Sequence, residues 1–239
     1  MLLNPLHTVG VVVLHIPDGF LNAPTWAGMM AASVVALQLS ARKSRGQLQA
    51  QEVPVLGMIG AFIFAAQMVN FPVALGTSGH LLGGALAVAL VGPWNATLVL
   101  AAVLAIQALV FQDGGLLAFG ANVFNMAVLA PWVAYLCLRY LPGGQRWPAW
   151  SVFWASFISV MAAAIMAALQ LAFSGTASLS KLLPAMLIWH VLIGVGEGII
   201  TASVLGFLQR SGRWAGLRER SICVQAKSAC VIRGYGWHC

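Results

Sequence analysis

The sequence has few charged residues: Asp, Glu, Lys and Arg make up 7% of the chain, and only 5 residues are acidic. Water-soluble domains carry about 25% charged residues. With 61% hydrophobic residues, this chain cannot cover a soluble surface, which predicts an all-α polytopic membrane protein. Its apolar runs are too long for barrel strands and do not alternate, which favours helices over a β-barrel.

Cysteine-based and nucleotide-binding motifs are also missing. Cys137, Cys223, Cys230 and Cys239 form no C-x-x-C pair, and together with His238 they fit no zinc-site spacing. We expect no disulfide, because Cys137 lies in an apolar run and the others follow the last span on the predicted reducing side. The chain has no Walker A run, so it is not expected to hydrolyse ATP.

Seven apolar segments approach the roughly 20 residues that a membrane-spanning helix requires. The third is short and borders the pair Gly92–Pro93, so we expect a tilted or partly re-entrant helix there. The segments cover residues 24–41, 52–71, 79–92, 93–112, 119–140, 148–173 and 184–209.

Basic residues gather after the first, fifth and seventh segments, at residues 42–45, 139–146 and from Arg210 onward. The positive-inside rule assigns these three regions to the cytoplasm. An odd number of spans then places the N-terminus outside and the C-terminus in the cytoplasm. Because this placement accounts for the net charge of +7, the sequence predicts membrane lipid but no nucleic acid as a partner.

Two polar breaks between the segments each carry one histidine. His15 opens the run His-Ile-Pro-Asp-Gly-Phe-Leu at residues 15–21, and His80 closes the run Gly-Thr-Ser-Gly-His at residues 76–80. Both breaks and the loop at residues 112–115 fall on the outer side in this topology. Imidazole is a common ligand of transition metals, so the sequence predicts metal capture from outside.

Polar side chains also recur inside the apolar segments. Gln67 and Asn70 are three residues apart and share a helix face, and Asn122 and Asn125 repeat this spacing. These amides either bond between helices or form a second shell around a ligand. Glu197 is expected to pair with a polar neighbour, with direct metal ligation as the alternative.

Small residues recur every fourth position on the first segment, at Gly28, Ala32 and Ala36. Such a stripe lets helices approach closely. It either packs within this chain or docks on a separate membrane protein.

A different class of function is suggested by Gly76-Thr77-Ser78-Gly79, which matches the G-x-S-G pattern of rhomboid-type intramembrane proteases. Ser78 would be the nucleophile and His190 its base. This interpretation leaves the His15 run unexplained, and His190 is otherwise expected to be structural or second-shell. A metal-independent channel or a structural membrane subunit is a third possibility.

An ordered set of motifs resembles that of the CbiM/NikM family, the substrate-binding (S) components of cobalt and nickel energy-coupling factor (ECF) transporters. The resemblance extends over residues 15–209 or so. Its motifs lie at residues 15–21, 67–72, 76–84, 111–115, 122–126 and 190–201.

The resemblance implies a seven-helix S component that captures Co²⁺ or Ni²⁺ from outside a bacterial inner membrane, in support of cobalamin biosynthesis or nickel supply. The chain itself would be neither an enzyme nor dependent on a cofactor. It would work with a transmembrane coupling subunit, two cytosolic ATPases and, in some systems, a small accessory membrane subunit. The stripe of Gly28, Ala32 and Ala36 would dock on the coupling subunit.

The resemblance also implies a metal site. The free N-terminal amine, the backbone nitrogen and imidazole of the next histidine, and a second histidine would form a square plane of nitrogens. Here the two histidines are His15 and His80, and the amine belongs to Leu14. The implied second shell consists of Asp18, Gln67, Asn70, Ser78, Asn122 and Asn125.

Thirteen residues precede Leu14 and would remove this amine. Because some leucine codons serve as bacterial start codons, we expect translation to begin at Leu14 and residues 1–13 to be a non-native extension. The transmembrane domain is expected to cover residues 14–210. Residues 211–239 form a basic cytoplasmic tail that we expect to be disordered, and the motifs do not distinguish Co²⁺ from Ni²⁺.

Overall fold

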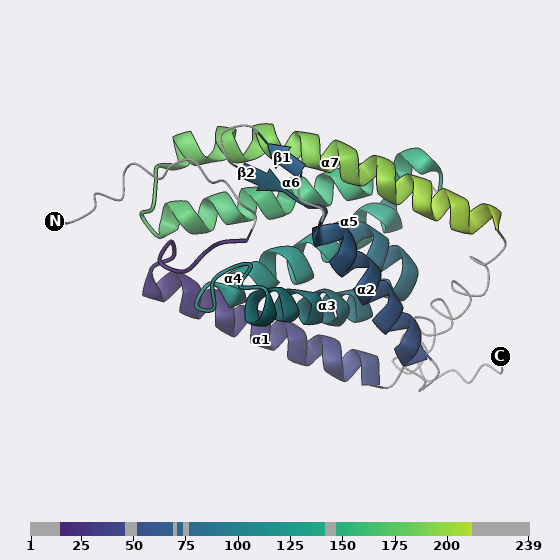
Figure 1. The fold of residues 1–239 in the computed structure, drawn as a ribbon, viewed down its shortest axis with the longest axis horizontal. Helices are drawn as coiled ribbons and strands as arrows, with labels where there is room; N and C mark the ends of the chain where they lie inside the picture. The colour runs from purple at the N-terminus through teal and green to yellow at the C-terminus, as the bar shows by residue number, and fades with distance from the viewer. Residues whose placement is uncertain (1–14, 46–51, 69–70, 74–76, 142–146, 212–239) are drawn as a thin grey trace.

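The structure is a computed structural model that describes residues 15–45, 52–68, 71–73, 77–141 and 147–211. Long helices account for most of this part of the chain (Figure 1). They are α1 (Ala23–Arg45), α2 (Val53–Met68), α3 (Gly84–Val110), α4 (Phe119–Asn122), the π-helix η3 (Val123–Leu129), α5 (Ala130–Tyr140), α6 (Ala149–Phe173) and α7 (Leu179–Arg210).

Four helical stretches of the described residues are long and apolar enough to cross a membrane: α3, the continuous run Phe119–Tyr140, α6 and α7. The α2 helix is apolar but has only 16 residues. The prediction of a helical, multi-pass membrane protein is therefore confirmed, whereas the predicted number of seven spans is not supported.

The predicted third and fourth segments meet within α3, at the boundary that the sequence indicated. The helical backbone of α3 is interrupted there, because Gly92 adopts φ 77° and ψ 168°. Pro93 follows the kink and has no N–H for the helical ladder. Leu86 before the kink and Leu100 after it are buried in the same apolar cluster, so both parts of α3 pack into one core.

A short antiparallel ribbon, β1 (Phe71–Val73) and β2 (Thr77–Gly79), precedes α3. The all-α prediction missed this ribbon and instead began a helix at residue 79. The α2 helix ends at Met68, and Pro72 disfavours helical backbone in the residue before it. Phe71 pairs with Gly79 across the ribbon, so His80 directly follows β2, four residues before α3 begins.

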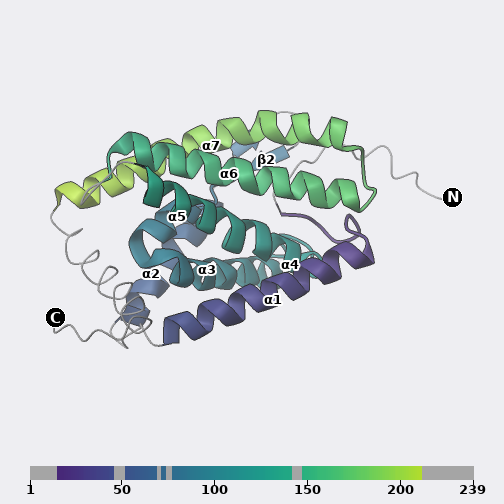
Figure 2. The same cartoon turned by 180° about the vertical axis from the view of Figure 1, so that it is seen from behind.

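The helices form two groups, α6 with α7 and α1 with α4. Helices α6 and α7 lie side by side in both views, and α1 lies at the opposite edge of the molecule (Figures 1 and 2). The Ser33 hydroxyl of α1 donates a hydrogen bond to the Gly120 carbonyl at 2.6 Å, which joins α1 to α4. The run Phe119–Tyr140 contacts both groups, because its segments pack against α1, α3 and α6.

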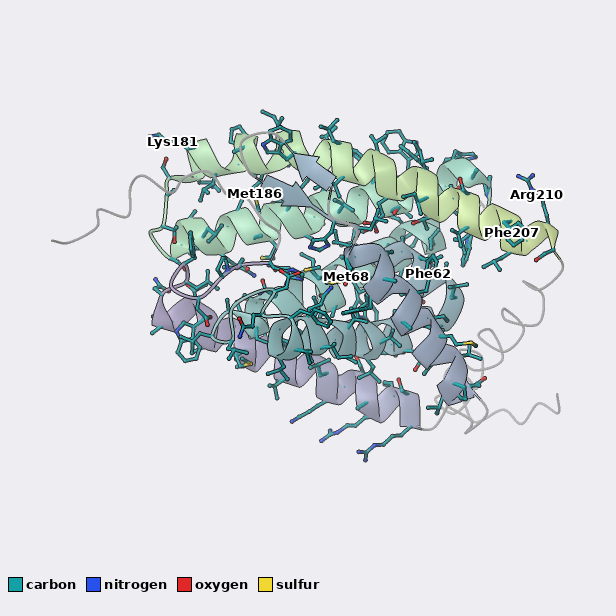
Figure 3. The ribbon with its side chains drawn as sticks, in the orientation of Figure 1. Phe62, Met68, Lys181, Met186, Phe207 and Arg210 are labelled. Atoms are coloured by element: carbon teal, nitrogen blue, oxygen red, sulfur yellow. The ribbon has the colours of Figure 1, made fainter. Side chains whose placement is uncertain are left out.

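The two ends of the molecule differ in charge. Arg42, Lys43 and Arg45 lie in the last turn of α1, and Arg210 lies in the last turn of α7. Figure 1 shows the C-terminal ends of α1 and α7 at the same end of the molecule, and Figure 3 shows Arg210 there and Lys181 at the opposite end.

Candidate functional site

His15 and His80 come together although they are 65 positions apart in the sequence. Their rings stack with centroids 4.7 Å apart and an angle of 26° between the planes. The exposed fraction is only 3% for His15 and 7% for His80. His15 comes from the segment before α1 and His80 from the loop after β2, so the structure unites the two histidines that the sequence singled out.

The His80 ring has a free nitrogen. Its Nδ1 lies 3.0 Å from the Leu81 carbonyl oxygen, and because a carbonyl only accepts, the proton of the neutral ring belongs on Nδ1. Nε2 is buried and has no hydrogen-bond partner. Burial, followed by the charge of nearby His15, lowers the pKa of His80 to about 4. The ring is therefore neutral at pH 7, which is the form that binds a metal.

Asp113 accompanies the His15 ring. Its Oδ1 lies 3.1 Å from His15 Nδ1, and the carboxylate is 36% exposed. The imidazole lowers the pKa of the Asp113 carboxyl below its usual value. Neither His15 ring nitrogen has a directional hydrogen bond. The contact with Asp113 is therefore close enough for an ion pair but does not have the geometry of a hydrogen bond. Sequence reasoning predicted this loop on the same side as the two histidine-bearing breaks but did not select Asp113 as a site residue.

Residues 15–22, called here the N-terminal strap, are fixed by the run that begins at α4. The Ile16 N–H donates to Asn122 Oδ1 at 2.8 Å, and Asn122 Nδ2 donates to the Ile16 carbonyl at 3.1 Å. The Gly115 N–H also donates to that carbonyl at 3.0 Å. These three bonds fix the backbone next to His15, so Asn122 acts on the ring through the peptide it holds.

Asp18 holds the loop that carries Asp113. Its carboxylate accepts N–H bonds from Leu116, Leu117 and Ala118 at 3.0, 2.8 and 3.2 Å, just before α4 begins. This is the position at which carboxylates stabilise a helix N-terminus. A Cβ at Gly115 would lie 2.2 Å from Asp18 Oδ1, so only glycine allows this approach.

The far end of the strap contacts the turn between α6 and α7. Asn22 Nδ2 donates to the Phe173 carbonyl at 3.3 Å, and the Thr176 hydroxyl donates to the Phe20 carbonyl. No sequence motif indicated these contacts. The strap is thus tied to segments from both halves of the chain.

The loop after His80 is held by two helices. Glu197 of α7 accepts N–H bonds from Leu82 at 2.7 Å and Gly83 at 3.1 Å. Gln67 of α2 donates to the Leu82 carbonyl at 2.8 Å and accepts a bond from Gln107 of α3, also at 2.8 Å. The prediction that Glu197 pairs with a polar neighbour is confirmed, and its partners are backbone groups of the His80 loop.

The other predicted polar residues have mixed outcomes. Asn125 forms a reciprocal pair with Gln170 of α6, both bonds measuring 2.8 Å, so it bonds between helices. His190 is 1% exposed, with Nδ1 at 2.7 Å from the Met186 carbonyl oxygen and Nε2 without a partner. Three predicted positions, Leu14, Asn70 and the Ser78 side chain, lie outside the described residues.

Of the small-residue stripe, only Gly28 lies fully clear of the packing surface of α1. Gly28 is exposed with no atom within 4 Å of a Cβ placed on it, and Ala32 and Ala36 are half-buried. The fully buried positions of α1 are Ser33, Ser40 and Ser44. Packing within this chain therefore does not account for Gly28.

Within the parts of the chain that the structure describes, no three His, Cys, Asp or Glu side chains gather to hold a metal ion. The paired imidazoles supply two nitrogen donors. A square-planar or octahedral site needs further donors, and backbone nitrogens or residues before His15 are the nearest sources in sequence.

Comparison with known proteins gives a consistent result. The family model CbiM, described as a cobalt uptake substrate-specific transmembrane region, matches residues 15–213. The cobalt transport protein CbiM of Acetohalobium arabaticum is 34% identical over 209 residues, covering 83% of this chain and 82% of that protein. A solved structure described as a truncated transition metal transporter has a TM-score of 0.75 and 34% identity, covering 82% of this chain and 99% of that one.

Fused relatives are longer than this chain. The fused nickel transport protein NikMN of Rhodobacter capsulatus is 38% identical over 216 residues, which cover 83% of this chain. The match spans 62% of that protein and 65% of a NikMN relative from Archaeoglobus fulgidus. The remaining length of these relatives has no counterpart in the match.

Proposed function

The chain belongs to the CbiM family of cobalt uptake transmembrane regions, and on that premise we propose that it is the substrate-binding component of an ECF-type importer of Co²⁺ or Ni²⁺. Its relatives are cobalt and nickel transport proteins, so the chain is a transport protein and not itself an enzyme. The observation that carries the proposal is the buried pair of stacked imidazoles from His15 and His80.

The chemistry of this pair fits a transition-metal ion as the transported substrate. His80 offers a neutral ring whose Nε2 is buried without a partner, and a buried polar atom of this kind calls for an explanation. Its other nitrogen lies against a carbonyl oxygen, the arrangement that orients histidine ligands in metal sites. Asp113 adds negative charge beside the ring of His15.

We propose that the ion is held by His80, by the ring and backbone nitrogens of His15, and by an amine on residue 14. Four nitrogens in a plane suit Ni²⁺, and the family also includes cobalt proteins. Asp18, Gln67 and Asn122 position the two histidine-bearing segments. For Asn70 and Ser78 the same supporting role stays a proposal.

We propose that this site faces outward. The strap that carries His15 precedes α1, whose 23 residues end in Arg42, Lys43 and Arg45. A helix of that length separates its ends by about 34 Å. Basic residues favour the cytoplasmic side, so the proposal places the C-terminus with them and His15 at the opposite face.

Energy for import has to come from other chains. We propose a coupling subunit in the membrane that docks on the stripe of Gly28, Ala32 and Ala36, two cytosolic ATPases and a small accessory membrane subunit. The open space around Gly28 supports this docking surface. A bacterial inner membrane is the proposed location.

Equilibrium binding of Ni²⁺ and Co²⁺ tests the site. The chain would be purified in two forms, one with all 239 residues and one that begins at position 14 with Leu14→Met. We expect tight binding by the form with an amine at position 14. His80→Ala in that form should weaken binding about 100-fold or more, because loss of an outer-shell partner of a metal ligand already costs about 10–100-fold.

His238→Ala is the matched control, because it also removes one imidazole but lies outside every motif. It should leave both affinities unchanged. Binding by neither form would reject the metal-transport proposal. Equal affinity of His80→Ala and the unmodified protein would reject the proposed ligand set, while the ratio of Ni²⁺ to Co²⁺ affinity would identify the preferred ion.

A further inference from the structure

The peptide units around Leu82 are held on both sides by side chains from two different helices. Glu197 of α7 accepts the Leu82 N–H at 2.7 Å, and Gln67 of α2 donates to the Leu82 carbonyl at 2.8 Å. The second carboxylate oxygen of Glu197 accepts the Gly83 N–H at 3.1 Å. Leu82 is 0% exposed, so its backbone bonds to Glu197 and Gln67 are shielded from bulk solvent. We call this arrangement the Leu82 clamp.

The clamp also completes the start of α3. This helix begins at Gly84, and its N-cap residue Gly83 has no side chain to bond the free N–H groups. Such groups are stabilised by an oxygen acceptor and by negative charge. Glu197 supplies the acceptor from another helix, although an acidic side chain inside a membrane span is costly and usually functional.

Resting on the function proposed above, we infer that Glu197 and Gln67 are positioning residues that hold His80 in the metal site and make its position depend on α7 and α2. His80 is two residues before Leu82 and is itself hydrogen-bonded to the Leu81 carbonyl. If α7 shifted relative to α2, Glu197 and Gln67 would pull the Leu82 backbone in different directions. His80 would then leave the ion, which gives the transporter a means of release.

The packing around the clamp is not complete. A small cavity of about 20 Å³ lies there, lined in part by Phe62, Gln67, Gly83, Glu197 and Thr201. Phe62 is 52% exposed, and Figure 3 shows it between α2 and α7 in this view. The hydrogen bonds of Glu197 and Gln67 therefore lie where the contact between the two helices is incompletely filled.

The test uses the form that begins at position 14, with Glu197→Ala, Glu197→Gln and Gln67→Met. Ni²⁺ affinity would be measured by titration, and the number of bound imidazoles by pulsed EPR with Cu²⁺ as the probe ion. We expect Glu197→Ala and Gln67→Met to weaken Ni²⁺ binding about tenfold or more. The EPR signal should fall from two imidazoles to one. Glu197→Gln keeps one carbonyl acceptor and should lie between the unmodified protein and Glu197→Ala.

Gln209→Met is the control for Gln67→Met. Gln209 also donates its amide to a main-chain carbonyl, that of Trp147 at 3.4 Å, but near the far end of α7. The control should keep both imidazoles and full affinity. If the folded clamp variants also keep two imidazoles and full affinity, the inference is wrong. If Glu197→Ala does not fold, the imidazole counts and Ni²⁺ affinities of Glu197→Gln and Gln67→Met decide whether the inference holds. Absence of binding by the unmodified protein would instead reject the proposed function.

Discussion

The side-chain amide of Asn122 makes a reciprocal pair of hydrogen bonds with the backbone of Ile16, 106 positions away in the sequence. The bonds measure 2.8 and 3.1 Å, and both residues are buried. The amide bonds both the N–H and the carbonyl of Ile16, as the neighbouring strand of a sheet would. The residue next to Ile16 is His15, whose position is therefore set by the run Phe119–Tyr140.

Replacement of Asn122 by alanine should loosen the strap. It leaves the buried Ile16 N–H without an acceptor, which costs about 1–3 kcal/mol. We expect Ni²⁺ affinity to fall about tenfold or more, measured by titration. Asn125→Ala is the control, since Asn125 pairs with Gln170 instead. It should lower the free energy of unfolding and leave the affinity unchanged, and equal affinity losses in both variants would contradict this role of Asn122.

Neutralising Asp113 should weaken metal binding without loosening the fold. Asp113→Asn keeps the shape of a side chain that is 36% exposed, and it removes the negative charge 3.1 Å from His15 Nδ1. We expect Ni²⁺ affinity to fall about tenfold, a free-energy change of about 1.4 kcal/mol, with a smaller loss at high salt because exposed charges are screened. Titrations at two salt concentrations measure both effects. An unchanged affinity at low salt would show that Asp113 does not act on the ion.

Gly115→Ala should push the strap away from the loop before α4. The new methyl group would meet Asp18 at its backbone nitrogen, 2.4 Å away, as well as at its carboxylate. We expect thermal unfolding to show a loss of about 1–3 kcal/mol and Ni²⁺ binding to weaken in parallel. Gly206→Ala on α7 is the control, because the nearest atom to its new methyl group is 3.9 Å away in the Arg210 side chain. If both variants are as stable as the original, the close contact at Gly115 is not important.

Gly28→Leu tests the docking stripe. Because no atom lies within 4 Å of a Cβ at Gly28, the isolated chain should keep its stability and its Ni²⁺ affinity. Co-purification with the coupling subunit should drop several-fold, since a large side chain prevents close helix contact. Gly57→Leu on α2 is matched, as Gly57 is also exposed with open space around it. Equal recovery of the coupling subunit with both variants would place the docking surface elsewhere.

Local composition predicted much of this molecule. Long apolar runs indicated the helices, and five of the seven predicted segments correspond to α1, α2, Phe119–Tyr140, α6 and α7. The remaining two correspond to the two parts of α3, which meet at a kink at Gly92, next to Pro93. Glycine-rich polar breaks likewise identified His15 and His80, since such runs are rare in an apolar chain.

The supporting contacts were harder to predict because they join positions that share no local pattern. Asp18, Gln67 and Asn122 were selected as a group, but not the backbone groups that they bind. Glu197 was expected to have a polar partner, and only the fold shows that its partners are Leu82 and Gly83. Thr176 carries no motif, and its bond to the strap depends on how the turn between α6 and α7 lies against residue 20.

That last contact bears on the order in which the protein can be completed. The strap is made early, but Thr176 is 156 positions later than Phe20. At the roughly 5–20 residues per second of protein synthesis, the ribosome needs about 8 to 30 seconds to reach it. During that interval the strap and His15 are present while the helix bundle is only partly inserted into the membrane. The two histidines can adopt their final arrangement only after α6 and α7 have entered the membrane, so a nascent chain interrupted before that point should bind no metal.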